Sequence, residues 1–173
     1  MACDCRTIAG AVCEKHKIIA PVPVDPTTTA YTAGDAIIVS SIQVERGVFD
    51  LPNGNANVVE VVIRNDNATS TPKKGMEIIF FSEAPTGDLT AAINGAITLD
   101  ADDWAKVCNR VQIVTANYVD GWQQSTARIT GNWAVWNTST DDKTALWYCI
   151  VCTEAQTYTA GGVISAMIDL KIN

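Results

Sequence analysis

The sequence predicts a β-sandwich, in which two β-sheets pack face to face, and three observations support this fold class. From Tyr31 onward, hydrophobic residues recur at every second position in several segments, which is the period of a strand with one buried face. Clusters of Pro, Gly, Asn and Asp separate these segments and are typical of turns. The chain of 173 residues is 47% hydrophobic and 18% charged, so it can bury a substantial core. About eight short strands in two layers are therefore expected.

Three segments alternate most clearly between hydrophobic and polar residues. The predicted buried faces are Val59, Val61 and Ile63 in segment 58–64, Met76, Ile78 and Phe80 in segment 76–82, and Ile164, Ala166, Ile168, Leu170 and Ile172 in segment 163–172. Glu60 and Arg64 take the opposite face in the first segment and Ser165, Asp169 and Lys171 take it in the third, as expected for half-buried strands. Segments 36–42, 110–115 and 128–136 are weaker strand candidates.

The segment 145–152, with the sequence ALWYCIVC, is hydrophobic on both faces. A strand of this composition is typical of the centre of a sheet that is covered on both sides. The covering layer is expected to be another sheet or a subunit interface.

One or two helical turns are predicted at 101–107. Asp100 is a suitable N-cap, and Asp102 and Asp103 would lie at the positive end of the helix dipole. This capping role accounts for the acidic residues better than a catalytic carboxylate pair does.

The first part of the chain, residues 1–27, differs in composition from the body at 28–173. Its prolines and the threonines that follow favour extended or polyproline II backbone over helix. We expect an arm that docks on a neighbouring subunit; the alternative is an edge strand that pairs with the first strand of the body. The candidate contact residues of the arm are Ile18, Ile19, Pro21 and Pro23.

The N-terminal cysteines form a candidate metal site. Cys3, Cys5 and Cys13, together with His16, make a Cys₃His set that suits tetrahedral zinc, although the spacing is not that of a standard zinc knuckle. Disulfides formed in an oxidising medium and free thiols are the alternatives. The other three cysteines, Cys108, Cys149 and Cys152, are expected to be small buried hydrophobic residues.

Twelve basic and nineteen acidic residues give the chain a net charge of −7. A surface of this sign repels phosphate backbones and anionic lipids, so neither nucleic acid nor a membrane is an expected partner. No run of about 18 hydrophobic residues is present, and charged residues interrupt the region in which a signal peptide would have its hydrophobic core. We therefore expect synthesis in the cytoplasm.

The sequence does not predict an enzyme. Nucleophilic catalysis of the Ser-His-Asp or Cys-His kind needs an imidazole held beside the nucleophile, and the single histidine, His16, lies in the predicted arm. The motifs G-x-S-x-G, G-x-x-x-x-G-K-[ST] and H-E-x-x-H are absent from the sequence.

Five tryptophans leave carbohydrate binding open as a function, because sugars stack on exposed aromatic rings. Trp122 follows a glycine in a predicted loop and is the tryptophan expected to be exposed. Trp133 and Trp136 would lie on opposite faces of one strand. Packing of these rings in the core is the simpler explanation.

Several short segments together resemble one family. The segment Thr29–Ile37, TAYTAGDAI, resembles the Y-x-A-G-D-x-I opening of a group of small virion proteins of tailed bacteriophages. The similarity continues through 58–64, 76–85, 99–104, 146–151, 157–159 and 168–172, and covers about residues 28–173.

This resemblance implies a head decoration, or cement, protein. Proteins of the family that this chain resembles are jelly-roll β-sandwiches that bind the outer surface of the assembled capsid, commonly as trimers. They have no catalytic residues. The expected partners are the major capsid protein and further copies of the chain, and the expected location is the virion, after synthesis in the host cytoplasm. By the same resemblance, Tyr31, Gly34 and Asp35 are structural residues that shape the first strand and its turn.

Two other functions remain as alternatives. The first is a carbohydrate-binding or host-adhesion module on the virion, in which exposed aromatic residues would form the working surface. The second is another virion component, such as a tail or neck protein. Under the main prediction, the fold is a jelly-roll-like β-sandwich of about eight strands with one short helix and an extended N-terminal arm.

Overall fold

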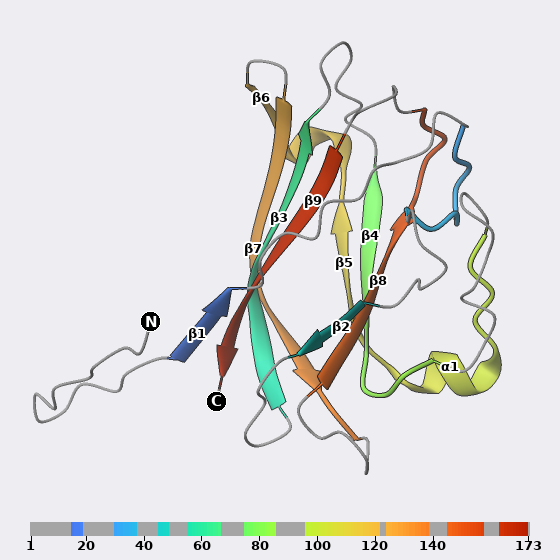
Figure 1. The fold of residues 1–173 in the computed structure, drawn as a ribbon, viewed down its shortest axis with the longest axis vertical. Helices are drawn as coiled ribbons and strands as arrows, with labels where there is room; N and C mark the ends of the chain where they lie inside the picture. The colour runs from blue at the N-terminus through green and yellow to red at the C-terminus, as the bar shows by residue number, and fades with distance from the viewer. Residues whose placement is uncertain are drawn as a thin grey trace, which may run out of the picture.

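The computed structural model describes residues 15–18, 30–37, 45–48, 55–66, 75–85, 96–121, 124–138, 145–157 and 163–172. In these residues two antiparallel β-sheets pack face to face, with one short α-helix outside them (Figure 1). In chain order the elements are β1 (Lys15–Ile18), β2 (Glu45–Val48), β3 (Asn55–Asp66), β4 (Met76–Phe81), α1 (Ala101–Ala105), β5 (Val107–Ile113), the 3₁₀ turn η1 (Thr115–Asn117), β6 (Tyr118–Gly121), β7 (Gln124–Trp136), β8 (Ala145–Cys152) and β9 (Val163–Ile172). The predicted all-β sandwich with one short helix is confirmed.

The strand order is that of a jelly roll. One sheet has the order β1-β9-β3-β7-β6 and the other has the order β2-β8-β4-β5. The pairs β1–β9, β2–β8, β3–β7 and β4–β5 are nested, so that strands from the two ends of the chain pair first and the middle strands pair last. A long antiparallel hairpin folded over into two sheets produces this order. The short strand β6 extends the edge of the larger sheet beyond β7.

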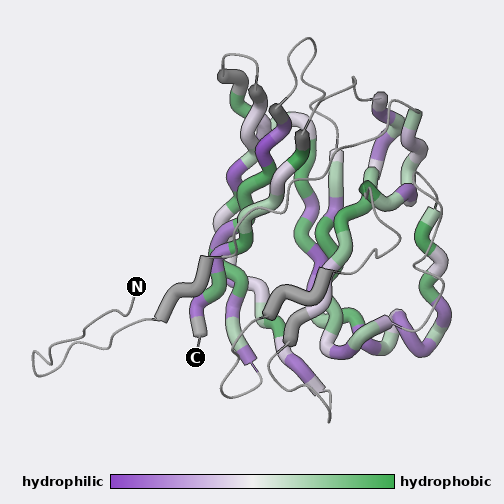
Figure 2. Tube along the Cα trace, viewed as in Figure 1, coloured by the Kyte–Doolittle hydropathy of each residue, from purple (hydrophilic) through white to green (hydrophobic). Residues whose placement is uncertain are grey.

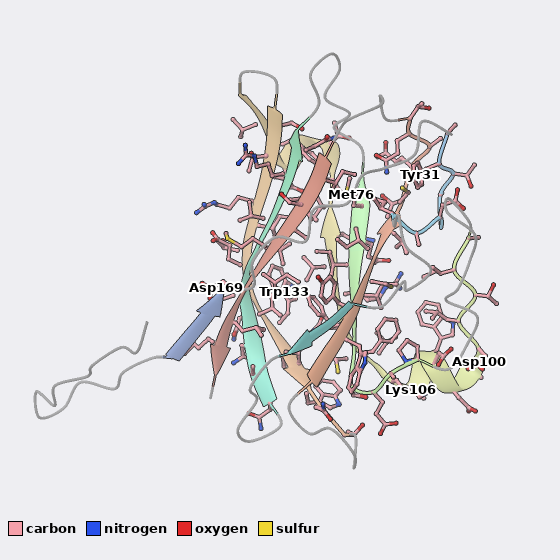
Figure 3. All side chains as sticks on the ribbon, viewed as in Figure 1. Tyr31, Met76, Asp100, Lys106, Trp133 and Asp169 are labelled. Atoms are coloured by element: carbon pink, nitrogen blue, oxygen red, sulfur yellow. The ribbon has the colours of Figure 1, made fainter. Side chains whose placement is uncertain are left out.

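The main core fills the space between the sheets. Met76, Ile78 and Phe80 of β4 and the even-numbered residues of β9 from Ile164 to Leu170 are buried there, which confirms the predicted inward faces of these strands at these positions. The side chain of Ile172, which was predicted to share the face of β9, lies outside the part that the structure describes. Figure 2 shows hydrophobic and hydrophilic residues alternating along the long strands of the five-stranded sheet. Trp133 of β7 packs against the same core, and Figure 3 shows its side chain between the two sheets, whereas Asp169 lies on the outer face.

One predicted inward face is wrong in detail. Val58, Val61 and Ile63 of β3 are fully buried, while Val59 is only half-buried. The cause is an irregularity between Val58 and Glu60, where the register shifts in the pairing of β3 with both neighbouring strands. An extra residue at a β-bulge reverses the in-and-out alternation beyond it.

The outer face of the four-stranded sheet carries a second, smaller core. Ile79 and Phe81 of β4 and Cys149 and Val151 of β8 are buried there. Four residues pack over this cluster: Ile97, Leu99, Val107 and Trp147. The two hydrophobic faces of β8 are thus covered by the opposite sheet and by the chain's own segment from Ile97 to Leu99. The prediction of a central strand is confirmed, and its outer face is covered within the subunit.

The N-terminal region contributes an edge strand to the sandwich. β1 pairs with β9, with His16 opposite Lys171 and Ile18 opposite Asp169. The alternative of an edge strand therefore describes residues 15–18, but the partner is the last strand of the body and not the first. In the segment 36–42, a weaker strand candidate, the described residues end at Ile37, and Ala36 forms an isolated bridge to Val151.

Candidate functional site

The segment that carries the resemblance, Thr29–Ile37, includes a tight turn that begins at a buried tyrosine. The Tyr31 side chain is fully buried, and its backbone N–H donates to the Gln156 carbonyl oxygen at 2.7 Å. The Asp35 carboxylate accepts hydrogen bonds from the Thr32 N–H at 2.6 Å and from the Thr32 hydroxyl at 2.9 Å. Gly34 has φ of 95°, a backbone conformation that favours glycine because it has no Cβ. Each of these contacts holds the turn in shape.

This turn joins two distant parts of the chain. The Gly34 N–H donates to the Cys152 carbonyl oxygen at 2.7 Å, and the Ile97 N–H donates to the Gly34 carbonyl oxygen at 3.2 Å. The Cys152 N–H in turn donates to the Asp35 carbonyl oxygen at 2.8 Å. The segment from Ala96 to Leu99 is thereby attached beside the end of β8, on the outer face of the smaller sheet.

The helix α1 continues from this segment and holds Trp104 at the same face. The Asp100 carboxylate caps the helix by accepting a hydrogen bond from the Asp103 N–H at 2.8 Å, as predicted. At the other end, Lys106 donates to the Ala84 carbonyl oxygen and to the Asp103 carboxylate, both at 3.3 Å. Figure 3 labels Asp100 and Lys106 at the two ends of this helix. The predicted helix extends to residue 107, whereas α1 ends at Ala105 and Val107 already begins β5.

A pocket of about 560 Å³ opens between the segment that runs from Ile97 to Trp104 and the outer face of β4, β5 and β8. Apolar side chains such as Ile79 and Val151 form part of its floor. Its polar and aromatic lining residues are Glu77, Thr98, Trp104, Arg110, Gln112 and Thr153. Small-molecule sites in proteins have volumes of about 300–1,000 Å³, so this pocket is large enough for such a ligand.

An ion pair between a buried glutamate and a half-exposed arginine lies in the floor of the pocket. The Glu77 side chain is only 6% exposed, and its carboxylate accepts a hydrogen bond from the Arg110 guanidinium, whose side chain is 48% exposed. Glu77 and Arg110 come from adjacent strands, β4 and β5, with Ile79 directly opposite Arg110 in the register. The guanidinium carbon of Arg110 also lies 5.5 Å from the centre of the Trp104 ring, a cation–π distance. One carboxylate, one guanidinium and one indole therefore form a connected group at the pocket.

Burial raises the pKa values of the three cysteines outside the N-terminal region, Cys108, Cys149 and Cys152. Cys149 and Cys152 are buried, and burial raises the pKa of each thiol to about 12. Cys108 is half-buried, and burial raises the pKa of its thiol to about 11 although it hydrogen-bonds to the Trp136 carbonyl oxygen at 3.2 Å. Thiols with such pKa values stay protonated and unreactive at neutral pH. The expectation that they are buried hydrophobic residues is confirmed for Cys149 and Cys152 and holds in part for Cys108.

The predicted N-terminal sites fall mostly outside the described residues. Outside the described residues lie Cys3, Cys5, Cys13, Ile19, Pro21 and Pro23, and also Trp122 of the predicted loop. For His16 and Ile18 the structure describes the backbone, which belongs to β1. Within the part of the chain that the structure describes, no group of three or more His, Cys, Asp or Glu residues is arranged to hold a metal ion. The helices among the same residues are too short to span a membrane.

The sequence did not indicate that Trp104 lines a pocket. Trp104 is 47% exposed, and Trp136 is exposed at the end of β7, whereas Trp133 packs against the core. The sequence pattern around Trp104 indicates a helix, but it does not indicate which strands the helix packs against. Glu77 and Arg110 are 33 residues apart in the chain, so no local pattern could have paired them.

No family model matches this chain. A search of the curated proteins likewise finds no significant match.

Proposed function

We propose that this protein is a structural virion protein that binds the outer surface of an assembled phage capsid and stabilises it without covalent bonds, as a homotrimer. The partners would be the major capsid protein and two further copies of the chain.

One observation carries this proposal beyond the similarity of short motifs. Two of the segments that resemble decoration proteins lie side by side in the jelly roll: Ala36 forms a bridge to Val151, and the Ile37 N–H donates to the Ile150 carbonyl oxygen at 3.0 Å. Backbone hydrogen bonds also join the turn at Gly34 and Asp35 to Cys152 and Ile97, which lie next to segments 146–151 and 99–104 in the chain.

The physical mechanism is mass action. A protein that binds the assembled shell better than its free subunits shifts the equilibrium toward intact particles, by a free energy that grows with its concentration over its dissociation constant. A rigid sandwich can span two neighbouring capsid subunits at little entropic cost, because it is folded before it binds. The net charge of −7 would help to keep the decorated particle soluble.

The test is co-sedimentation of the full-length protein with capsids stripped of their decoration protein. We expect saturable binding, with shells that withstand higher temperature after binding. The arm variant Ile19→Ser with Pro21→Ser should bind with at least tenfold lower affinity, which corresponds to about 1.4 kcal/mol of lost contact.

The matched control is Arg128→Gln, on the outer face of the larger sheet, which should bind as the unchanged protein does. Full-length protein that stays in the supernatant at every concentration would contradict the capsid proposal. A monomer by sedimentation velocity, with full capsid occupancy, would contradict only the trimer.

A further inference from the structure

We propose that the pocket between α1 and the outer face of the smaller sheet binds a neutral saccharide. This inference goes beyond capsid attachment and does not depend on it. It rests on the group formed by Glu77, Arg110 and Trp104, with Gln112 beside it.

The buried carboxylate is the first reason. Moving a carboxylate out of water costs free energy, and a hydrophobic side chain of similar size would fill this position without that cost. Glu77 nevertheless lies among Ile79 and Val151 in the floor, with Arg110 as its partner. A carboxylate has about four sites that can accept hydrogen bonds. Adjacent hydroxyl groups of a sugar can donate to Glu77 and accept from Arg110 at the same time.

The balance of charge selects a neutral ligand. The charges of Glu77 and Arg110 cancel in the floor. Asp100 and Asp102 lie at the start of α1, the helix that carries the pocket residue Trp104, and the whole chain carries −7. Anionic sugars and nucleotides would therefore be repelled. A purely apolar ligand would remove water from the ion pair without replacing its hydrogen bonds, which is unfavourable.

The indole and the neighbouring polar side chains supply the remaining contacts. Trp104 is about half exposed although the Arg110 guanidinium lies over its ring. The C–H face of a pyranose ring packs on such an indole, as other apolar groups do. Gln112, Thr98 and Thr153 are exposed and line the pocket, where they can both donate and accept hydrogen bonds. The volume of about 560 Å³ lies within the ~300–1,000 Å³ of small-molecule sites.

The experiment screens the full-length protein against an array of neutral oligosaccharides and their sialylated or uronic acid counterparts. Each ligand found is then titrated by calorimetry. We expect saturable binding of at least one neutral oligosaccharide with a dissociation constant from about 10 µM to 1 mM. Gln112→Ala and Arg110→Gln should each weaken that binding at least tenfold.

The matched control is again Arg128→Gln, because Arg128 also pairs with a glutamate, Glu60, at 3.0 Å but lies on the other sheet. It should leave saccharide affinity unchanged. Gln112 is an exposed residue, so Gln112→Ala tests the pocket even if Arg110→Gln unfolds the protein, and thermal denaturation verifies both folds.

Three results would overturn the inference: no saturable binding to any neutral oligosaccharide, unchanged affinity in folded Gln112→Ala, or tighter binding of the anionic counterparts. Gln112→Ala should still co-sediment with capsids, so failure of the saccharide inference and failure of capsid attachment can be told apart.

Discussion

Gly131 and Trp133 share one space on the inner side of β7. A Cβ atom on Gly131 would lie 2.5 Å from two carbon atoms of the Trp133 indole, far inside van der Waals contact. The large ring therefore fills the space that a side chain at position 131 would need. The irregular pairing of β3 between Val58 and Glu60 lies opposite this part of β7.

Gly131→Ala should destabilise the protein by about 1–3 kcal/mol, because the rigid indole has to move out of its packed position. This exceeds the gain of about 0.4–1 kcal/mol that an alanine brings by restricting the unfolded chain. Urea unfolding followed by tryptophan fluorescence measures the change. Asn132→Ala, at an exposed neighbouring position, is the control and should be near neutral. A Gly131→Ala variant as stable as the unchanged protein would contradict the packing of Trp133.

Because of the buried thiols, the free energy of unfolding should depend on pH in the alkaline range. Unfolded cysteines release their protons near the ordinary pKa of 9.0, whereas the folded Cys149 and Cys152 thiols have pKa values raised to about 12 by burial. Both states are protonated below pH 9, so the contribution to stability is complete there. Above pH 9 the unfolded chain loses protons first, and stability falls as the pH rises toward 12.

At pH 10 the loss should be on the order of 1 kcal/mol per buried thiol relative to pH 8. The measurement is the free energy of unfolding in urea at several pH values from 8 to 10.5. Cys149→Ala should reduce the slope above pH 9, even though the substitution lowers stability at every pH. The same slope with and without the thiol would show that other groups cause the loss.

At the scale of elements, α1 is held mainly from its ends. Five residues are too few for a stable isolated helix, so the Asp100 cap, the Lys106 contacts and the packing of Leu99 have to supply the stability. The same contacts position Trp104 at the pocket. Loss of the cap should therefore affect both folding and ligand binding.

Asp100→Ala should destabilise the protein by about 1 kcal/mol, because the Asp103 N–H loses its hydrogen-bond acceptor. Thermal denaturation measures the effect. Asp102→Ala removes an exposed acid from the same turn without removing a cap and should cost much less. Equal losses in the two variants would indicate an effect of charge and not of capping.

The element types could be predicted from the sequence, whereas some details of the strands could not. Alternation identified the inward faces of β4 and β9, because in-and-out direction is a local property of a strand. It failed at Val59, since the irregularity in β3 depends on its pairing with both neighbours. The hydrophobic outer face of β8 was recognised, but its cover, Ile97 and Leu99, lies about fifty residues earlier in the chain.

At the scale of the whole molecule, β1 protects an edge. It pairs with β9, and without it the backbone N–H and C=O groups on that side of β9 would be left open. Exposed edges of this kind promote self-association. The N-terminal region thus contributes to the fold of the body, in addition to any role in docking.

A chain of residues 28–173 lacks β1 and should have a free energy of unfolding lower by on the order of 2 kcal/mol than a chain of residues 15–173, because the backbone hydrogen bonds between β1 and β9 are lost. Urea unfolding and size-exclusion chromatography measure stability and self-association. If the two truncated chains are equally stable, β1 contributes nothing to the sandwich.

Composition, alternation and turn residues were sufficient to establish an all-β sandwich, its clearest inward faces and the cap of its helix, because each of these depends on residues near one another in the chain. Tertiary structure decided which strand β1 joins, what covers β8, and that Glu77, Arg110 and Trp104 meet in one pocket. These features arise from pairs of residues that are distant in sequence, and chain folding alone brings such residues within the few ångströms over which hydrogen bonds and packing act.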